Sequence, residues 1–188
     1  MIIASNTYNQ QKSIRLKGYD YSQAGLYFVT ICTQSHICLF GEVYQHEMIL
    51  NEAGTITNQC WLDIPNHFPD VAIHDHVIMP NHIHGILEII VGTNNNSSEE
   101  IGTFQSPKRT VGSVIRGFKN GVIKNLKKAG LLEQILANNY SPLHVIKRNS
   151  IWQRNYYEHI IRNEDSCNKI ADYINQNPTN WKNDKYYN

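Results

Sequence analysis

The spacing of hydrophobic residues along this 188-residue chain predicts several β-strands. Residues 26–33 are rich in β-branched and aromatic side chains, a composition typical of a buried strand. Residues 71–79 and 83–91 are two further apolar runs, and the proline-containing pair between them is a turn signal. We therefore expect two adjacent strands joined by a short turn. Residues 38–50 are compatible with another strand or a hairpin.

Three other segments have hydrophobic residues three or four positions apart, which is the spacing of amphipathic helices. The first covers residues 51–62, begins with an asparagine suited to an N-cap and ends before Pro65. The second is a basic helix over residues 113–130. The third covers residues 163–177 and ends there because Pro178 follows. The order of these elements predicts an α+β fold in which helices cover one face of a sheet.

The length of the chain and its 41% content of hydrophobic residues fit one compact domain over residues 1–188. Residues 92–106 form a polar, low-complexity stretch within it, which predicts a mobile loop. No apolar run approaches the roughly 20 residues that cross a bilayer, and the N-terminus lacks a secretory signal. The four cysteines form no CxxC pair, which favours reduced thiols over disulfides or a zinc site. We therefore expect a cytoplasmic protein without a membrane partner.

Charge is strongly segregated along the chain, although the net charge is only +1. Residues 35–104 contain nine acidic residues and no Lys or Arg, whereas residues 105–154 contain ten basic residues and one acidic residue. Such a basic stretch supplies the sequence-independent attraction to phosphates on which nucleic-acid binding depends. A solvated helix face has the same pattern, so charge alone leaves both interpretations open.

The strongest chemical signal is the pair His82 and His84 in the segment MPNHIHG. Side chains alternate between the two faces of a strand, so both imidazoles project from the same side. This spacing suits a divalent metal ion, whose charge would polarise a phosphate oxygen, and it also fits two histidines on a solvated sheet face. A second pair, His74 and His76, lies a few residues upstream and competes for the same role.

Five segments, taken in order, carry a resemblance to a known family. They are SIRLKGYDY at residues 13–21, YFVTIC at 27–32, VIMPNHIHG at 77–85, WQRNYYEHIIR at 152–162 and DYINQNP at 172–178. Together they resemble the REP-associated tyrosine transposases, which are single-tyrosine members of the HUH superfamily, named for its His-hydrophobic-His motif. The resemblance runs from about residue 12 to residue 181 and implies a ferredoxin-like or RRM-like antiparallel sheet.

The resemblance also implies an activity. Members of this family are metal-dependent endonucleases and strand transferases that act on single-stranded DNA with hairpins. A tyrosine on a late helix attacks a phosphate, leaving a 5′-phosphotyrosine link and a free 3′-hydroxyl. Carried over to this chain, the resemblance makes His82 and His84 ligands of Mg²⁺ or Mn²⁺ and Asn177 the third ligand. Members include monomers and dimers, and the sequence does not decide between them.

The resemblance and the helical spacing both favour Tyr173 as the nucleophile. In the family the nucleophile precedes an Asn-Pro pair by a short spacer, and here that residue is Tyr173. Tyr173 and Asn177 are four positions apart, so they lie on one face of the last helix, beside an apolar stripe that can pack on the sheet. The main competitor is Tyr157, and the alternative role of Tyr173 is that of a half-buried helix residue. A phenol has an unperturbed pKa of about 10, so the nucleophile needs activation.

The family comparison gives the basic stretch a DNA-binding role. Arginine and aromatic side chains hold unpaired bases and phosphates, although the same side chains can pack the last helix on the sheet. We expect Trp152 to lie in the core and the following cations to contact DNA: Arg116, Lys119, Lys124, Lys127 and Arg154.

Two other functions compete with the transposase interpretation. One is a DNA-binding protein, derived from a transposase, that recognises repeat hairpins without cutting them. The other is a hydrolase of the histidine-triad type that uses water. That type has a third alternating histidine, and this chain has Ile86 at the corresponding position, which makes it the weakest of the three.

Overall fold

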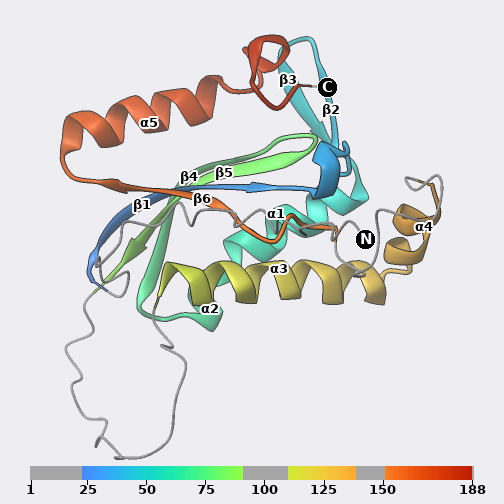
Figure 1. Ribbon diagram of the computed structural model, residues 1–188, viewed down its shortest axis with the longest axis horizontal. Coiled ribbons are helices and arrows are strands. Elements are labelled where there is room, and N and C mark those ends of the chain that lie inside the picture. The colour runs from blue at the N-terminus through green and yellow to red at the C-terminus, as the bar shows by residue number, and fades with distance from the viewer. Residues whose placement is uncertain (1–22, 91–109, 139–150, 188) are drawn as a thin grey trace, which may run out of the picture.

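A computed structural model describes residues 23–90, 110–138 and 151–187 of the chain. Its centre is a four-stranded antiparallel sheet with the strand order β4-β5-β1-β6 (Figure 1). These strands are β1 (Gly25–Cys32), β4 (Val71–Ile78), β5 (His82–Ile89) and β6 (Tyr157–Ile161). A separate hairpin pairs β2 (Gly41–Tyr44) with β3 (Glu47–Leu50).

The described helices are α1 (Glu52–Leu62), α2 (Ile64–His67), α3 (Val111–Lys128), α4 (Leu131–Asn138) and α5 (Glu164–Gln176). The helix α1 lies between β1 and β4 in the chain, and α3 lies between β5 and β6. The chain therefore has the β-α-β-β-α-β order of a ferredoxin-like fold. The predicted α+β class with a ferredoxin-like or RRM-like antiparallel sheet is confirmed.

Capping side chains explain where the long helices begin. Asn51 before α1 and Asn163 before α5 each accept a hydrogen bond from a backbone N–H of the first helical turn. Thr110 and Ser113 form a reciprocal capping box at the start of α3. The basic helix therefore begins two residues earlier than predicted, because Ser113 belongs to its first turn.

The helices cover both faces of the sheet, which corrects the prediction that they lie on one face. In Figure 1, α1, α2 and α3 lie below the sheet and α5 lies above it. Strand alternation supplies both layers, because β1 directs Val29 into the large core and Phe28 into a smaller cluster with Ile86 and Ile174. The apolar stripe of α5 packs on the second face because α1 and α3 already occupy the first.

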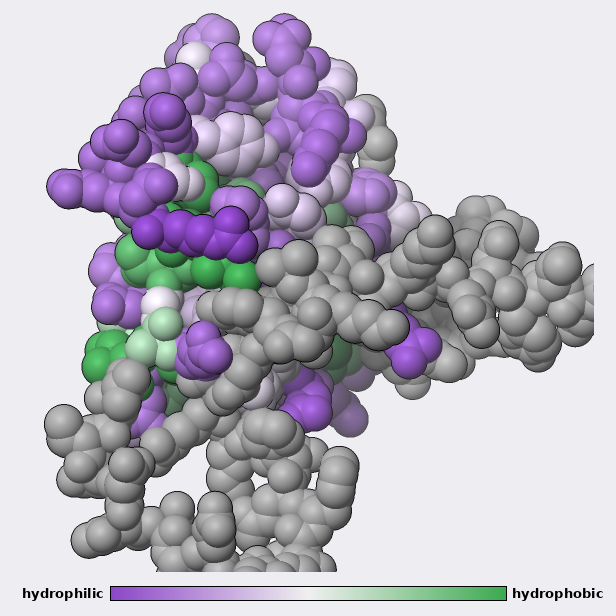
Figure 2. All heavy atoms as spheres, turned by 60° about the vertical axis from the view of Figure 1, so that its left-hand side comes forward, coloured by the Kyte–Doolittle hydropathy of each residue, from purple (hydrophilic) through white to green (hydrophobic). Residues whose placement is uncertain are grey.

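The surface of α5 agrees with this placement. Cys167, Ile170 and Ala171 lie partly buried against the small cluster, and Ile174 is fully buried. The outward side of α5, at the top of Figure 2, is hydrophilic, and hydrophobic residues lie beneath it. The helix that carries Tyr173 is therefore held on the sheet through one narrow apolar face.

Besides the short helices, two elements were not predicted. The strand β6 pairs with β1, with Leu26 opposite Ile161 and Thr30 opposite Tyr157, but only Glu158 and Ile161 of β6 are buried. Its sequence therefore lacks the apolar run that marks the central strands, and its pairing partner lies more than a hundred residues away. The other element is α4, which lies in a part of the sequence that has no clear periodicity.

Two sequence predictions concern parts of the chain that the structure does not cover. The predicted polar loop at residues 92–106 and the motif at residues 13–21 lie outside the described residues. Across the described ranges, no helix combines the length and the apolar character needed to cross a membrane.

Close packing at the centre of β5 gives a test of the large core. A Cβ at Gly85 would collide with the ring of Trp61, which is fully buried. We expect Gly85→Ala to lower the free energy of unfolding by about 1–3 kcal/mol, because the tryptophan has no space to move. Urea denaturation followed by tryptophan fluorescence measures the change.

The control is Gly121→Ala on α3, where a Cβ meets no atom within 4 Å. Alanine is the better helix former, so this variant should gain up to about 1 kcal/mol. Equal stability of Gly85→Ala and the unaltered protein would contradict the packing described for this strand.

Candidate functional site

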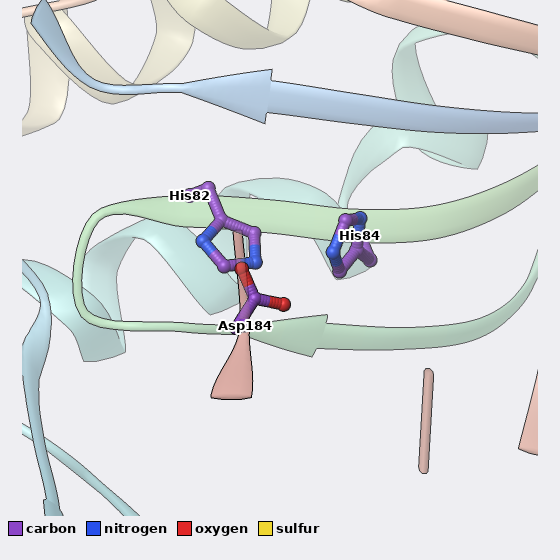
Figure 3. A group of neighbouring side chains, drawn as sticks. All are labelled: His82, His84 and Asp184. Carbon is purple, nitrogen blue, oxygen red and sulfur yellow. The ribbon is translucent and has the colours of Figure 1, made fainter. Parts of the chain in front are cut away.

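His82 and His84 lie side by side on the α5 face of the sheet. Their rings are 4.5 Å apart between centroids, and the two residues are 0% and 1% exposed. Asp184 approaches them from the C-terminal segment that follows α5 (Figure 3). One ligand atom from each of the three side chains lies within 4.8 Å of the other two. Strand alternation thus brings the histidines together as predicted, and the tertiary structure adds a carboxylate.

The Asn81 side chain sets the tautomer of His82. Its amide Nδ2 donates to the carbonyl oxygens of His36 at 3.1 Å and Tyr186 at 2.7 Å. The amide oxygen is therefore the acceptor for His82 Nδ1, 2.9 Å away. The remaining nitrogen, His82 Nε2, is buried and has no hydrogen-bond partner among the described residues. An imidazole lone pair oriented in this way by its other nitrogen is typical of a metal ligand.

His84 is oriented by two hydroxyl groups. Thr30, its cross-strand neighbour on β1, places Oγ1 2.9 Å from His84 Nδ1. The Tyr173 hydroxyl lies 3.1 Å from His84 Nε2. These two contacts occupy both ring nitrogens of His84. The side chain of Tyr173 therefore contacts the histidine pair directly.

Burial keeps both histidines neutral. It lowers the pKa of His82 to about 4, even though the nearby Asp184 carboxylate acts in the opposite direction. Burial and the neighbouring His82 lower the pKa of His84 well below its usual value. Neutral imidazole is the form that binds metal ions, so both rings are available as ligands at neutral pH.

Asn177 supplies a second buried acceptor without a partner. It caps the C-terminal end of α5 and is 2% exposed. Its Nδ2 donates to Asp184 Oδ2 at 3.2 Å, which leaves its oxygen, Oδ1, unsatisfied among the described residues. Buried acceptors normally have partners, so an unsatisfied imidazole nitrogen and amide oxygen beside a carboxylate fit a divalent cation. His82, His84 and Asp184 can hold a metal ion, and Asn177 contacts the Asp184 carboxylate.

Asp184 was not among the predicted ligands. It follows the short 3-10 helix Trp181–Asn183, in a polar segment without a recognisable motif. Its role depends on the chain turning back over the sheet after α5, and no local sequence pattern indicates that turn.

Tyr173 is positioned for chemistry but is not activated in this arrangement. It is 41% exposed and makes an edge-to-face contact with Phe28. Partial burial, with the negative charge of Asp184 as a second cause, raises its pKa to about 12. The phenol is therefore protonated at neutral pH and needs a positive charge or a base before it can attack a phosphate.

The competing tyrosine, Tyr157, lies on the same face of the sheet but has different contacts. Its ring packs edge-to-face on Phe28, and Lys185 Nζ lies 5.7 Å from the ring centroid. The hydroxyl of Tyr173, in contrast, contacts His84. Of the two tyrosines, Tyr173 is thus the one with a described hydroxyl contact to the histidine pair.

The upstream histidine pair does not form a cluster. His74 Nε2 lies 2.9 Å from a carboxylate oxygen of Glu88. The ring of His76 stacks on Trp61, and its Nε2 contacts Asn58 at 2.9 Å. A register shift in β4 between Ile73 and His76 breaks the regular alternation there.

The predicted DNA-binding residues lie away from the histidine cluster. The helix α3 packs on the opposite face of the sheet, and its side chains Arg116, Lys124 and Lys127 are exposed. Arg154 is exposed before β6 and lines a pocket of about 270 Å³ together with Arg116 and Lys119. Trp152 is 3% exposed and belongs to the large core, as predicted.

Lys119 differs from the other predicted cations because it is largely buried. Its Nζ donates to the carbonyl oxygens of Gln153 at 2.8 Å and Asn155 at 3.3 Å, and it lies 6.0 Å from the Tyr156 ring centroid. It thereby ties α3 to the segment before β6.

Comparisons with known proteins support the fold. No protein-family model matches the chain. An uncharacterized protein of Haemophilus influenzae is 41% identical over 185 residues, which cover 95% of this chain and 94% of that protein. A solved structure of a REP-associated tyrosine transposase bound to a REP hairpin is similar with a TM-score of 0.54 and 18% identity, over 90% of this chain and 74% of that chain. At this level of identity the similarity shows a shared fold.

The buried position of Lys119 predicts a pH dependence of stability. Burial lowers its pKa from 10.5 to about 8, so folding disfavours the charged form. Below pH 8 the lysine is charged in both the folded and the unfolded protein, so the cost of burying the charge lowers the free energy of unfolding in full. As the pH rises toward 10.5 the folded protein loses the proton first, and this cost disappears. We therefore expect the free energy of unfolding to rise with pH over this range, relative to Lys119→Met.

Urea denaturation of the two proteins between pH 7.5 and 10.5 measures the difference. Lys124→Met removes an exposed lysine of the same helix and controls for the loss of one charge. A difference between the unaltered protein and Lys119→Met that stays constant with pH would contradict the proposed cost of burial.

Proposed function

We propose that this chain, which belongs to the same protein family as the Haemophilus influenzae protein and has the fold of a REP-associated tyrosine transposase, is a metal-dependent endonuclease and strand transferase for single-stranded, hairpin-bearing DNA. The observation that carries the proposal is the contact of 3.1 Å between the Tyr173 hydroxyl and a buried pair of neutral histidines. A nucleophile, two imidazole ligands and two oxygen ligands thus occupy one site.

His82, His84 and Asn177 would hold Mg²⁺ or Mn²⁺, and Asp184 would add a carboxylate. When bound, the ion would neutralise charge on a DNA phosphate and orient it. His84 Nε2, which contacts the Tyr173 hydroxyl in this structure, is the nitrogen that a metal ion would use. The Tyr173 hydroxyl is therefore free to turn toward a phosphate in the metal-loaded protein.

The proposed chemistry transfers the DNA strand to Tyr173. The phenol oxygen forms a bond to phosphorus, and the bond between phosphorus and the 3′-oxygen breaks. The leaving oxygen takes up a proton and becomes a 3′-hydroxyl, while the DNA keeps a 5′-phosphotyrosine link. With a metal ion on His84 Nε2, the Asp184 carboxylate, whose charge already raises the pKa of Tyr173, would accept the phenol proton. Attack by a 3′-hydroxyl on the same link would rejoin strands.

DNA contacts outside the site are assigned by charge and exposure. We propose that Arg116, Lys124, Lys127 and Arg154 bind phosphates of the hairpin, since all four are exposed. Lys119 already donates to two carbonyl groups, so we assign it to positioning the segment before β6. The solved REP-associated tyrosine transposase of the same fold is bound to a REP hairpin, which supports a hairpin partner here.

Metal binding can be tested without DNA. We expect Mn²⁺ or Mg²⁺ to stabilise the protein by about 2.7 kcal/mol at a concentration 100-fold above the dissociation constant. His82→Ala should lose this increment, because it removes an imidazole ligand. Thermal unfolding with and without the ion measures the increment, and His74→Ala, which alters the exposed histidine of the upstream pair, should retain it. An equal increment in His82→Ala would exclude this site.

Covalent catalysis is tested with a labelled single-stranded hairpin. We expect a DNA adduct that depends on Mn²⁺ or Mg²⁺ and persists on a denaturing protein gel. Tyr173→Phe should reduce the adduct to background because it removes the nucleophilic oxygen, whereas Tyr157→Phe should retain it. An adduct that persists in Tyr173→Phe and vanishes in Tyr157→Phe would reassign the nucleophile. Tight binding without any adduct would identify a non-cleaving hairpin-binding protein.

A further inference from the structure

A pocket of about 280 Å³ opens beside Tyr173, between the end of α5 and the C-terminal segment. Besides Tyr173, its lining consists of Gln176, Asn177, Asn180, Asn183, Asp184 and Lys185. Its size is near the lower limit of small-molecule sites, so it suits a single nucleotide better than a larger ligand. The buried histidines do not line the pocket, but Tyr173 and Asp184 belong to both the pocket and the histidine cluster.

The amide side chains give this pocket the chemistry of base recognition. Gln176, Asn180 and Asn183 are exposed, and each offers both donors and an acceptor. Asn180 is held in place because its Nδ2 donates to the Gln176 carbonyl oxygen at 3.2 Å. Primary amides form paired hydrogen bonds with base edges, and this pairing distinguishes one base from another.

Lys185 provides a positive charge at the same pocket. Its Nζ lies 4.7 Å from the Tyr186 ring centroid and 5.7 Å from that of Tyr157, so two aromatic rings hold the ammonium group. It forms no ion pair with a carboxylate of the described residues. Its charge also reaches the histidines, because it contributes to lowering the pKa of both His82 and His84. A cation held by aromatic rings and free of a carboxylate partner is suited to a phosphate.

We infer that this pocket binds the nucleotide next to the phosphate that Tyr173 attacks, with Lys185 pairing with a backbone phosphate and Asn180 and Asn183 reading the base. The inference rests on the proposed function, because the position of the nucleotide follows from Tyr173 as the nucleophile. A phosphodiester attacked by Tyr173 carries one nucleotide on each side. Because Tyr173 lines the pocket, a nucleotide bound there adjoins the attacked phosphate. Part of the cleavage specificity is thereby assigned to protein side chains at the end of α5.

The experiment uses the full chain and hairpin oligonucleotides in which the single-stranded flank is randomised. Sequencing the covalently captured DNA gives the base preference on both sides of the cleaved bond. At one of the two positions beside the cleaved bond, we expect one base to be preferred by at least about 10-fold. The double variant Asn180→Ala/Asn183→Ala should reduce this preference to about 3-fold or less. Asn168→Ala, which removes an exposed amide of α5 outside the pocket, should leave the preference intact.

Lys185 is tested by a different readout. Lys185→Gln should weaken binding of all flanking sequences equally and lower the slope of log affinity against log salt by about 0.7, the value for one contact to a single-stranded phosphate. Fluorescence anisotropy at several salt concentrations measures this slope. The matched control is Lys169→Gln, which alters an exposed lysine near the start of α5 outside the pocket.

The outcomes separate the inference from the proposed function. If adducts form but the base preference is unchanged in the amide variants, the inference is overturned and the proposed function stands. If the unaltered protein forms no adduct with either metal ion, the proposed function fails. The pocket is then tested by the binding of oligonucleotides alone, measured by fluorescence anisotropy. A base preference in anisotropy that the amide variants lose would then support a nucleotide-binding pocket, and equal binding of all bases would overturn it.

Discussion

The alternation of side chains along β5 is the constraint on which the rest of this structure depends. The strand lies between β4 and β1, and all of its residues except Glu88 are buried. Ile83 and Leu87 therefore face the large core, whereas His82 and His84 face α5. A shift of one residue in the register would place two imidazoles in the apolar core and two aliphatic side chains at the site. The core and the site thus stabilise the same register.

Burial of two imidazoles is costly, and the surrounding structure offsets part of that cost with hydrogen bonds. Asn81 satisfies one nitrogen of His82, and Thr30 and Tyr173 satisfy both nitrogens of His84. Two buried acceptors beside this pair, His82 Nε2 and Asn177 Oδ1, have no partner among the described residues. Unpaired buried acceptors beside a carboxylate are groups that a bound cation would satisfy.

The C-terminal segment completes the site rather than covering an independent one. Asp184 adds an oxygen to the histidine pair, Lys185 places a positive charge near it, and Tyr186 stacks on His36 and packs against His82. The backbone of Tyr186 also accepts a hydrogen bond from Asn81, the residue that orients His82. The geometry of the histidine pair and the position of the C-terminal segment are therefore coupled. The pocket beside Tyr173 exists only because this segment returns to the sheet.

The sequence alone determined the features that depend on neighbouring residues in the chain. The alternation around His82 and His84, the helical spacing of Tyr173 and Asn177, and the asparagine caps are all local patterns, so they could be recognised without a structure. The tertiary structure decided which of two histidine pairs forms a cluster, because a register shift in β4 and contacts with α1 separate His74 from His76. It also placed α5 on the second face, buried Lys119 and added Asp184 to the site. These features require contacts between segments far apart in sequence, and the geometry of such contacts depends on how the whole sheet packs rather than on any local pattern.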